Sequence, residues 1–464
     1  MSTKHSKAAA RFIANREQEQ WHNETLWFVR EKRDNMSKAV PEWEQLRDLA
    51  HRIKMHTVTH LDKYLPQFAE KAEANGITVH WAKDAHEHNE IVYKILQESN
   101  VRKLVKSKSM LTEECHLNPY LIERGIDVVE SDLGERILQL MGEAPSHIVM
   151  PAIHLKRQQV GKLFEEKMQT EKDNSDPTYL THTARRFLRN EFLTADAAMT
   201  GANFGVAATG DIVVCTNEGN ADMGTSLAPL HIVSMGLEKL VPDLQSMSVF
   251  TRLLARSATG QPVTTYTSHY RKPREGCRMH LVIVDNGRSD ILGNPDHIQL
   301  LKCIRCAACM NTCPVYRRSG GYSYTYFIPG PIGINLGMAK NPLAYYDNVS
   351  ACSLCYSCNN VCPVEINLAD QIYLWRQDLD KYSKADSTKK LMSGGMKFIF
   401  GHPGLYNTAL KFAPLVNVAP RFVKYNGLND WGKGRELPRF AKESFTTLWK
   451  KGKVGPNSKK QSEQ

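Results

Sequence analysis

Eight cysteines in two short stretches are the residues of this sequence best suited to chemistry. The first stretch, CIRCAACMNTCP, contains Cys303, Cys306, Cys309 and Cys313, and the second, CSLCYSCNNVCP, contains Cys352, Cys355, Cys358 and Cys362. Thiolates bind soft metals, and clustered cysteines in a reducing compartment more often bind metal than form disulfides. The two stretches therefore predict a metal centre.

The spacing within each stretch favours iron-sulfur clusters over zinc. Both stretches follow the C-x-x-C-x-x-C-x-x-x-C-P pattern of bacterial ferredoxins, in which three thiolates hold one 4Fe-4S cluster and the fourth reaches to the other cluster. Four-cysteine zinc sites usually pair two separated C-x-x-C units instead. We therefore predict two 4Fe-4S clusters with crossed ligand sets. The first set is Cys303, Cys306, Cys309 and Cys362, and the second is Cys313, Cys352, Cys355 and Cys358.

The two stretches are joined by 38 residues that include GGYSYTYFIPGPIG. A free ferredoxin does not need so long a connection. We expect it to cover part of a cluster or to form a partner surface. The direction of electron flow does not follow from the sequence, because hydrogen bonding and exposure move cluster potentials over more than about a volt.

Upstream of the cysteines, short β-branched runs alternate with helical ones, which predicts a mostly parallel sheet covered by helices. The runs expected to be strands are GITVHWA, RKLVKSKS, IDVVESD, SHIVMPAIH, DIVVCTN, PLHIVSMG, PVTTYTSHY and MHLVIVDNG. The runs expected to be helices are TEECHLNPYLIERG, GERILQLMG and LEKLVPDLQSMSVFTRLLARSA, with Thr112 as a cap. The glycine-rich residues 199–220 lack dinucleotide and P-loop spacing, so we interpret them as turns between strands.

The sequence as a whole predicts four regions. They are residues 1–75, helical; 76–286, the α/β domain; 287–385, the two-cluster domain; and 386–464, helical with a disordered tail. The C-terminal region mixes apolar and basic residues, which favours packing against a partner and leaves room for a peripheral membrane contact.

Composition limits the compartment and the partners. No apolar run is long enough to span a membrane, and the basic, polar N-terminus lacks a signal-peptide core, so we expect a cytoplasmic protein. The net charge is +11, but lysine and arginine are spread along the chain without a nucleic-acid-binding motif, so we expect no nucleic acid as a partner. Cys115, Cys215 and Cys277 stand alone, and we interpret them as buried, inert thiols.

Several motifs in the same order resemble one family. KSKSMLTEECHLNPYLIERGIDVVESDLGERILQL, FLTADAAMTGANF, TNEGN, RSATGQ, DNGRS and CIRCAACMNTCPVYRRSGG are similar to the B-subunit family of the bacterial L-lactate utilisation system, iron-sulfur proteins with an LUD domain. The likeness runs from about residue 40 to the C-terminus. It implies an α/β domain related to the NagB/RpiA/CoA-transferase fold, followed by the two-cluster domain.

The resemblance also implies a function. It points to an electron-transfer subunit of a complex that oxidises L-lactate to pyruvate, together with a cysteine-rich A subunit and a LUD-containing C subunit. The electron acceptor stays unknown. In many members of that family serine occupies the position of Cys352, so this chain offers a complete thiolate set.

An alternative hypothesis assigns the chemistry to the LUD-like domain itself, which would bind and dehydrogenate lactate. Removing electrons from a 2-hydroxy acid requires a base and a cation for the carboxylate. The candidates are Lys106, Lys108, Glu113 and Glu218. Spacing alone does not assemble them, and the catalytic residues are unknown at this level.

Overall fold

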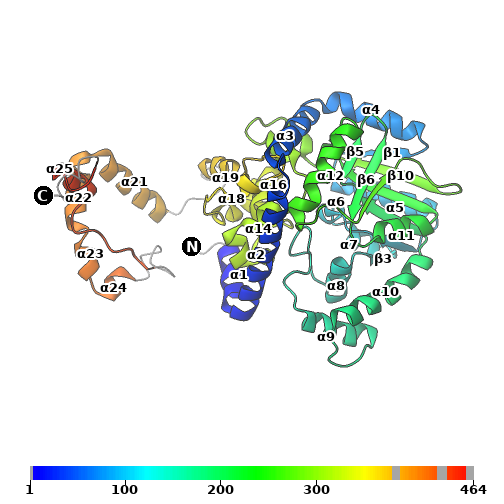
Figure 1. Cartoon of the computed structure of the whole chain (residues 1–464), viewed down its shortest axis with the longest axis horizontal. Coiled ribbons are helices and arrows are strands. Elements are labelled where there is room, and N and C mark those ends of the chain that lie inside the picture. The colour runs from blue at the N-terminus through cyan, green and yellow to red at the C-terminus, as the bar shows by residue number, and fades with distance from the viewer. Residues whose placement is uncertain (1–3, 379–386, 426–435, 456–464) are drawn as a thin grey trace. The chain divides into compact units, whose positions relative to one another are not determined.

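The computed structural model describes residues 4–378, 387–425 and 436–455 (Figure 1). The chain divides into two compact units, residues 1–382 and 383–464. Among the described residues, no helix has both the length and the apolar character needed to span a membrane. The tail expected to be disordered lies largely outside the described residues, and the four region boundaries stay a prediction.

A six-stranded, wholly parallel sheet forms the centre of the first unit. Its strands, in spatial order, are β1 (Thr78–Ala82), β10 (Arg278–Val284), β7 (Leu230–Gly236), β4 (Ala197–Gly201), β2 (Lys103–Lys106) and β3 (Asp127–Glu130). Every residue of β7 is buried, as expected for a central strand covered on both faces. The α/β class predicted from the sequence is confirmed.

A smaller, four-stranded sheet lies beside the first. Its strands are β8 (Leu240–Val241), β5 (Phe204–Val206), β6 (Asp211–Thr216) and β9 (Tyr266–Tyr270). The turn between β5 and β6 requires Gly210, whose φ is +74° and whose added Cβ would lie 2.6 Å from the backbone nitrogen of Ala72. The glycine-rich stretch therefore forms strands β4, β5 and β6 as well as the turns between them.

Helices fill the connections between these strands. They are α5 (Ala85–Glu98), α6 (Met110–Glu114), α7 (Leu117–Ile122), α8 (Leu133–Met141), α9 (Arg157–Met168), α10 (Pro177–Leu193), α11 (Asn220–Leu227), α12 (Leu244–Ala258) and α13 (Arg288–Leu292). Asp84, Asp132, Asp176 and Asp243 cap α5, α8, α10 and α12, each accepting a backbone N–H in the first turn.

Four N-terminal helices connect the sheet region to the cysteine region. They are α1 (Lys4–Ala14), α2 (Arg16–Lys38), α3 (Trp43–Thr59) and α4 (Leu61–Ala74). Helices α1 and α2 pack on the cysteine-region helices α14 (Ala308–Thr312) and α15 (Pro314–Ser319), away from the sheet (Figure 1). Helix α3 packs on α12, and α4 packs against β1. The N-terminus therefore belongs structurally to both halves of the unit.

The connection between the two cysteine stretches is a folded part of the core. It contains η3 (Gly321–Ser323), α16 (Gly330–Lys340), α17 (Pro342–Tyr345) and η4 (Tyr346–Ser350), and α18 (Ser357–Val361) and α19 (Leu368–Gln377) follow. All residues of α16 from Gly330 to Met338 are buried, and the helix packs on α14 and α19. Burial all around explains why α16 has no polar face.

The second unit consists of short helices. They are α21 (Ser387–Gly401), α22 (Pro403–Phe412), α23 (Leu415–Val418), α24 (Arg421–Lys424) and α25 (Phe445–Lys450). Prolines precede or begin three of them, at Pro403, Pro414 and Pro420, and limit their length.

Four local predictions were wrong. Residues 112–125, expected to form one helix, fall into the separate helices α6 and α7, because the backbone of His116 is left-handed, with φ of 53°. Residues 146–154, expected to form a strand, make turns because Ser146 O accepts a 2.7 Å hydrogen bond from Tyr316 Oη and the segment packs on the cysteine region. Residues 237–258 were expected to form one helix, but the helix begins at Leu244. The residues before it form η1 (Leu237–Lys239), β8 and a bend at Pro242. Ser109, not Thr112, caps α6, since its Oγ accepts from the backbone N–H of Thr112.

Packing at α16 gives a test of the fold. An added Cβ at Gly333 would lie 1.7 Å from Ile328 O, a backbone atom that cannot move independently. We expect Gly333→Ala to lower the free energy of unfolding by at least about 1–3 kcal/mol. Gly293→Ala is the control, because its Cβ would have only ordinary contacts, at 3.6 Å. Equal thermal midpoints for the two variants would contradict the close packing.

Candidate functional site

The two cysteine stretches fold as equivalent loops. Arg305 and Ala307 have left-handed backbones, with φ of 60° and 64°, and so do Leu354 and Tyr356 at the matching positions, with 53° and 60°. This conformation is uncommon for residues other than glycine and costs free energy. Because both loops repeat this conformation, we infer that they enclose the same kind of bound group. Helices α14 and α18 start directly after the left-handed residues.

The fold brings the eight thiols into two groups that cross between the stretches. One group, which includes the fourth cysteine of the second stretch, lines one cavity together with Ile148 and Ile332. Its members are Cys303, Cys306, Cys309 and Cys362. In the other group, in addition to burial, the charges of Cys352 and Cys355 raise the pKa of the Cys313 thiol, and the charges of Cys313, Cys352 and Cys355 raise the pKa of the Cys358 thiol. Its members are Cys313, Cys352, Cys355 and Cys358. These are the two predicted ligand sets, and their binding of iron stays a prediction.

Most of these thiols are poor thiolates without a metal. Burial raises the pKa of Cys313 to about 11 and raises the pKa of Cys306, Cys309 and Cys358 further, and neighbouring thiolates add to the effect for all four. Bound iron would reverse this preference, because metal ligation requires deprotonated thiols and supplies positive charge. The donor set therefore fits an iron-sulfur cluster chemically.

Backbone N–H groups point at four of the sulfurs. Arg305 N lies 3.4 Å from Cys303 Sγ, and Leu354 N lies 3.3 Å from Cys352 Sγ. Tyr316 N and Ile366 N donate to the sulfurs of Cys313 and Cys362, at 3.5 and 3.3 Å. Such donors stabilise thiolate charge and tune cluster potentials.

A cluster differs from a one-ion site in how its ligands are spaced. Within the described ranges, no three His, Cys, Asp or Glu side chains are placed to hold a single metal ion. A 4Fe-4S cube binds its four thiolates through four separate irons, so its ligands stand further apart than those of one ion.

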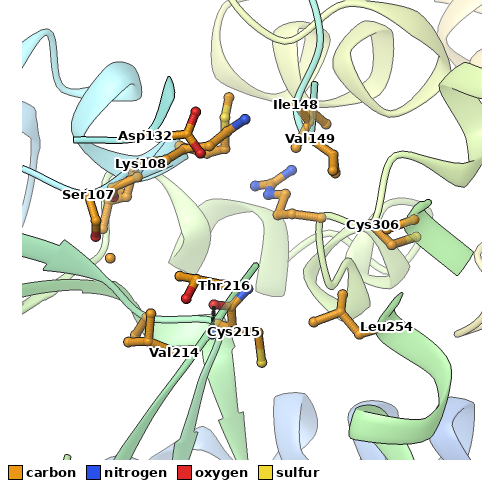
Figure 2. A pocket seen from close by; sticks show the side chains of 18 of the residues that line it. Ser107, Lys108, Asp132, Ile148, Val149, Val214, Cys215, Thr216, Leu254 and Cys306 are labelled. Atoms are coloured by element: carbon orange, nitrogen blue, oxygen red, sulfur yellow. Dashed lines mark hydrogen bonds between the residues drawn. The ribbon is translucent and has the colours of Figure 1, made fainter. Parts of the chain in front are cut away.

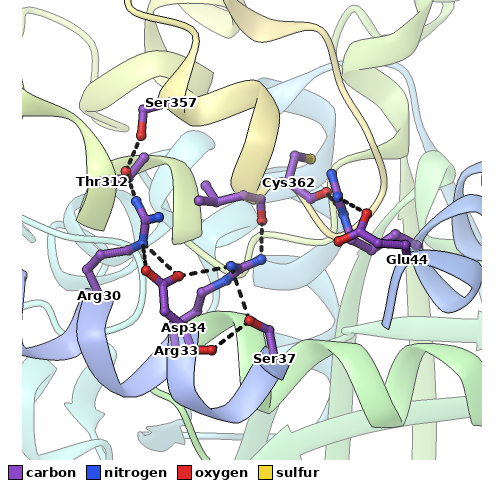
Figure 3. A network of polar contacts seen from close by, with 10 residues as sticks. Arg30, Arg33, Asp34, Ser37, Glu44, Thr312, Ser357 and Cys362 are labelled. Carbon is purple, nitrogen blue, oxygen red and sulfur yellow. Dashed lines mark hydrogen bonds and ion pairs between the residues drawn. The ribbon is translucent and has the colours of Figure 1, made fainter. Parts of the chain in front are cut away.

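Arginines of the N-terminal helices hold the second stretch in place (Figure 3). Arg33 Nη2 donates to Val361 O at 3.1 Å, and Arg47 Nε donates to Cys362 O at 3.0 Å. Arg30 contacts Thr312, and Asp34 binds Arg30 at 2.8 Å. These buried or half-buried cations would offset the negative charge that a loaded cluster carries. No local sequence pattern indicates these arginines, since the contacts join residues about 300 positions apart.

A pocket of about 350 Å³ lies between the α/β domain and the first cysteine loop. In Figure 2, Ser107, Lys108 and Asp132 lie on one side, and Cys306 and Leu254 lie on the other. Several wall residues follow the carboxyl ends of parallel strands, including Ser107 after β2 and Asp132 after β3. Ligands of open α/β sheets bind at this edge, and the volume falls in the usual range for small-molecule sites.

The structure divides the four candidates for lactate chemistry. Lys108 and Glu218 line the pocket, whereas Lys106 and Glu113 do not. Lys106 is fully buried, its Nζ lies 2.7 Å from Glu130 and 3.6 Å from Glu113, and these carboxylates raise its pKa. We therefore interpret Lys106 and Glu113 as structural.

Two carboxyl groups near the pocket hold protons more tightly than usual. Desolvation by the surrounding residues raises the pKa of Glu218 to about 7, and repulsion from Asp132 adds to it. Glu218 Oε2 also accepts a 3.1 Å hydrogen bond from Leu133 N. Burial raises the pKa of Glu135 to about 7 as well, although Lys108 opposes the shift from 3.6 Å.

A buried ionic network lies in the pocket wall that contains Glu238 and Arg288. Arg288 binds Glu238 Oε2 at 2.6 Å and Glu114 Oε2 at 2.9 Å. Gly236 makes room for the network, since an added Cβ would lie 2.2 Å from Glu238 Oε2. Arginine charge lowers the pKa of Glu238 to about 2 despite its burial. Sequence reasoning missed this network and also missed Arg305, although Arg305 lies inside the cysteine motif itself.

The three separate cysteines differ in exposure. Cys115 is buried, and burial raises the pKa of its thiol to about 12. Cys215 and Cys277 are half-buried, and Cys215 lines the pocket with a pKa raised to about 11 by burial. The raised pKa keeps the thiols of Cys115 and Cys215 protonated, but full burial is observed for Cys115 alone, and the inert role of the three cysteines stays a prediction.

Comparison with known families divides the chain into three matched segments. Residues 65–291 match the LUD domain, residues 299–366 match the 4Fe-4S dicluster domain, and residues 379–454 match the C-terminal domain of lactate utilisation protein B. The fold and the cysteine loops thus define an iron-sulfur protein in which a LUD domain precedes a 4Fe-4S dicluster domain.

Curated relatives match nearly the whole chain. Lactate utilization protein B of Geobacillus thermodenitrificans is 42% identical over 88% of both chains. That of Oceanobacillus iheyensis is 43% identical over 83% of this chain and 82% of the relative. The uncharacterized electron transport protein YkgF of Escherichia coli is 39% identical over 88% of both chains. The chain belongs to the lactate utilization protein B family, as the resemblance of its motifs indicated.

The raised pKa of Glu135 gives a pH-dependent test. Its folded-state pKa lies above the ordinary 4.5, so its stabilising contribution is complete below about pH 4.5 and is lost as the pH rises through about 7. Glu135→Gln stays neutral throughout. We expect this variant to gain stability relative to the native chain between pH 5 and pH 8, by at most about 3 kcal/mol in chemical denaturation. If the stability difference between Glu135→Gln and the native chain were the same at pH 5 and at pH 8, the raised pKa of Glu135 would be contradicted.

Proposed function

We propose that this protein is the electron-transfer iron-sulfur subunit of a complex that oxidises L-lactate to pyruvate. An iron-sulfur electron-transfer role in lactate use is supported by the dicluster domain together with the names of the relatives, lactate utilization protein B and an electron transport protein. The observation that carries the proposal is the pair of equivalent cysteine loops, whose eight thiols gather into two groups.

In this proposal each cluster is held by three cysteines of one stretch and one of the other. Bound clusters would supply one-electron transfer. The chain's own residues position the thiolates: left-handed loop residues direct the sulfurs inward, backbone N–H groups stabilise their charge, and arginines of α2 and α3 fix the second stretch. Crossing the ligands ties the two loops together, so that an electron would have a short path between the clusters.

The proposed partners are a cysteine-rich A subunit and a LUD-containing C subunit, in the cytoplasm. The C-terminal unit supports a role in contacting partners. Residues 387–425 contain six lysines and arginines and no acidic residue. Large apolar side chains on its described helices are exposed, among them Phe400, Phe412 and Phe422. The identity of the electron acceptor is not part of the proposal.

Paired cysteine variants test the crossed ligand sets. Protein purified without oxygen should contain about eight irons per chain, given two four-iron clusters. We expect Cys303→Ala to leave about four irons and Cys303→Ala/Cys362→Ala to leave the same number, because both residues serve one cluster. Cys303→Ala/Cys313→Ala should lose both clusters. The non-additive pair isolates the shared site.

The matched control is Cys115→Ala, a buried cysteine outside both stretches that should keep all irons. The opposite pattern, with Cys303 and Cys313 acting as one unit, would show uncrossed sets. Stoichiometric zinc with no reducible cluster would overturn the function itself.

A second candidate function is that this chain dehydrogenates lactate without help. The pocket favours it, because Cys306 forms part of the wall and a ligand there would lie beside the first thiol group. L-lactate added to the isolated chain, with all clusters oxidised, should then reduce them, as followed by visible absorbance. Reduction only after the partner subunits are added would reject this candidate and support the electron-transfer role alone.

A further inference from the structure

The pocket wall formed by the first cysteine loop carries a guanidinium group, that of Arg305, with one nitrogen from which no described protein group accepts a hydrogen bond. Arg305 lines the pocket beside Cys306, and its backbone is left-handed, with φ of 60°. Among the residues that the structure describes, none is a hydrogen-bond partner of its buried Nη1. A buried guanidinium nitrogen without a partner costs free energy, so this position calls for an acceptor.

The carboxylates nearest to Arg305 are already occupied. Glu238 and Glu114 act on Arg305 electrostatically, but both are bound by Arg288, at 2.6 and 2.9 Å. Lys239 also lies 4.0 Å from Glu238. Arg305 therefore shares these two carboxylates with Arg288 and Lys239 and binds neither of them alone.

A second cation lines the pocket from the α/β domain. Lys108 Nζ, like Arg305 Nη1, has no hydrogen-bond partner within the described part of the chain, and its ion pair with Glu135 is long, at 3.6 Å. Lys108 and Glu218 act on one another electrostatically, and both side chains line the pocket. The pocket thus combines two cations for a carboxylate with oxygen acceptors for a hydroxyl group, which Glu218 and Asp132 supply.

We infer that this pocket binds a small 2-hydroxycarboxylate, with Arg305 as the residue that recognises its carboxylate group. The planar guanidinium suits two parallel hydrogen bonds to a carboxylate. Lys108 supplies the second positive charge, and Glu218 accepts a hydrogen bond from the hydroxyl group. Ile148, Leu254 and Ile328 provide the apolar part of the wall. The inference rests on the proposed function for its ligand class, and it concerns binding only.

Both domains would then build one site. Lys108 and Glu218 come from the α/β domain, whereas Arg305 comes from the loop that carries Cys303 and Cys306. Arg305 also senses the charge of Cys303, so its other conceivable role is to offset cluster charge alone. A binding measurement separates the two roles, because a pure counter-charge would alter the cluster potential without changing carboxylate affinity.

The experiment measures binding of L-lactate to the anaerobically purified, cluster-loaded full chain by calorimetry, with pyruvate, acetate and inorganic phosphate as further probes. We expect L-lactate to bind and acetate to bind more weakly. Arg305→Gln should weaken L-lactate binding at least tenfold, the loss expected for a charged hydrogen bond. Lys108→Met should weaken it several-fold. Arg278→Gln, an exposed arginine outside the pocket, is the matched control and should bind as the native chain does.

Iron content and cluster absorbance accompany each titration. If Arg305→Gln loses its clusters, the inference is tested with Lys108→Met and Arg305→Lys instead. We then expect weaker L-lactate binding in Lys108→Met and measurable L-lactate binding in Arg305→Lys. Unchanged affinity in Arg305→Gln and Lys108→Met, no carboxylate binding by the native chain, or tighter binding of phosphate than of L-lactate would each overturn the inference. Normal clusters without carboxylate binding would leave the electron-transfer proposal standing, whereas absent clusters would remove that proposal instead.

Discussion

The structure depends on keeping charged sulfur inside a protein core. Six of the eight cysteines in the two stretches have thiols whose pKa rises, mainly through burial, so the core disfavours the thiolates that iron requires. Bound iron, backbone N–H donors and nearby arginines are the groups that can offset this cost. The need for them explains the left-handed loops and the position of α2 beside α14, which otherwise have no evident reason.

The same constraint links the two halves of the first unit. Residues 146–154 leave the α/β domain and pack on the cysteine region, where His147 Nε2 lies 2.9 Å from Asn311 Oδ1 and Ile148 lines the cavity of the first thiol group. Arg305 and Cys306 in turn line the pocket at the carboxyl edge of the parallel sheet. A ligand in the pocket and a cluster at the first loop would therefore share a wall, which is the arrangement that redox exchange between them needs.

Local patterns in the sequence predicted the parts of the fold that local physics determines. The cysteine spacing, the buried parallel strands and the amphipathic N-terminal helices all follow from periodicity or from ligand geometry. The predictions that were wrong depend on distant contacts. Residues 146–154 alternate like a strand, yet Tyr316 and Asn311 hold them as turns. Lys106 and Lys108 look equivalent in sequence, but only packing decides that the first pairs with Glu130 while the second reaches the pocket. Arg33 and Arg47 could not be assigned at all, because their acceptors lie more than 300 residues away.

We propose that two 4Fe-4S clusters lie close together because their ligands cross between the stretches. Electron paramagnetic resonance of the fully reduced native chain tests it most directly, since two reduced clusters at short range broaden and split each other's signals. We expect an interaction spectrum that integrates to about two spins per chain, because each of the two clusters accepts one electron. Two sharp, independent signals, or a single spin per chain, would contradict it.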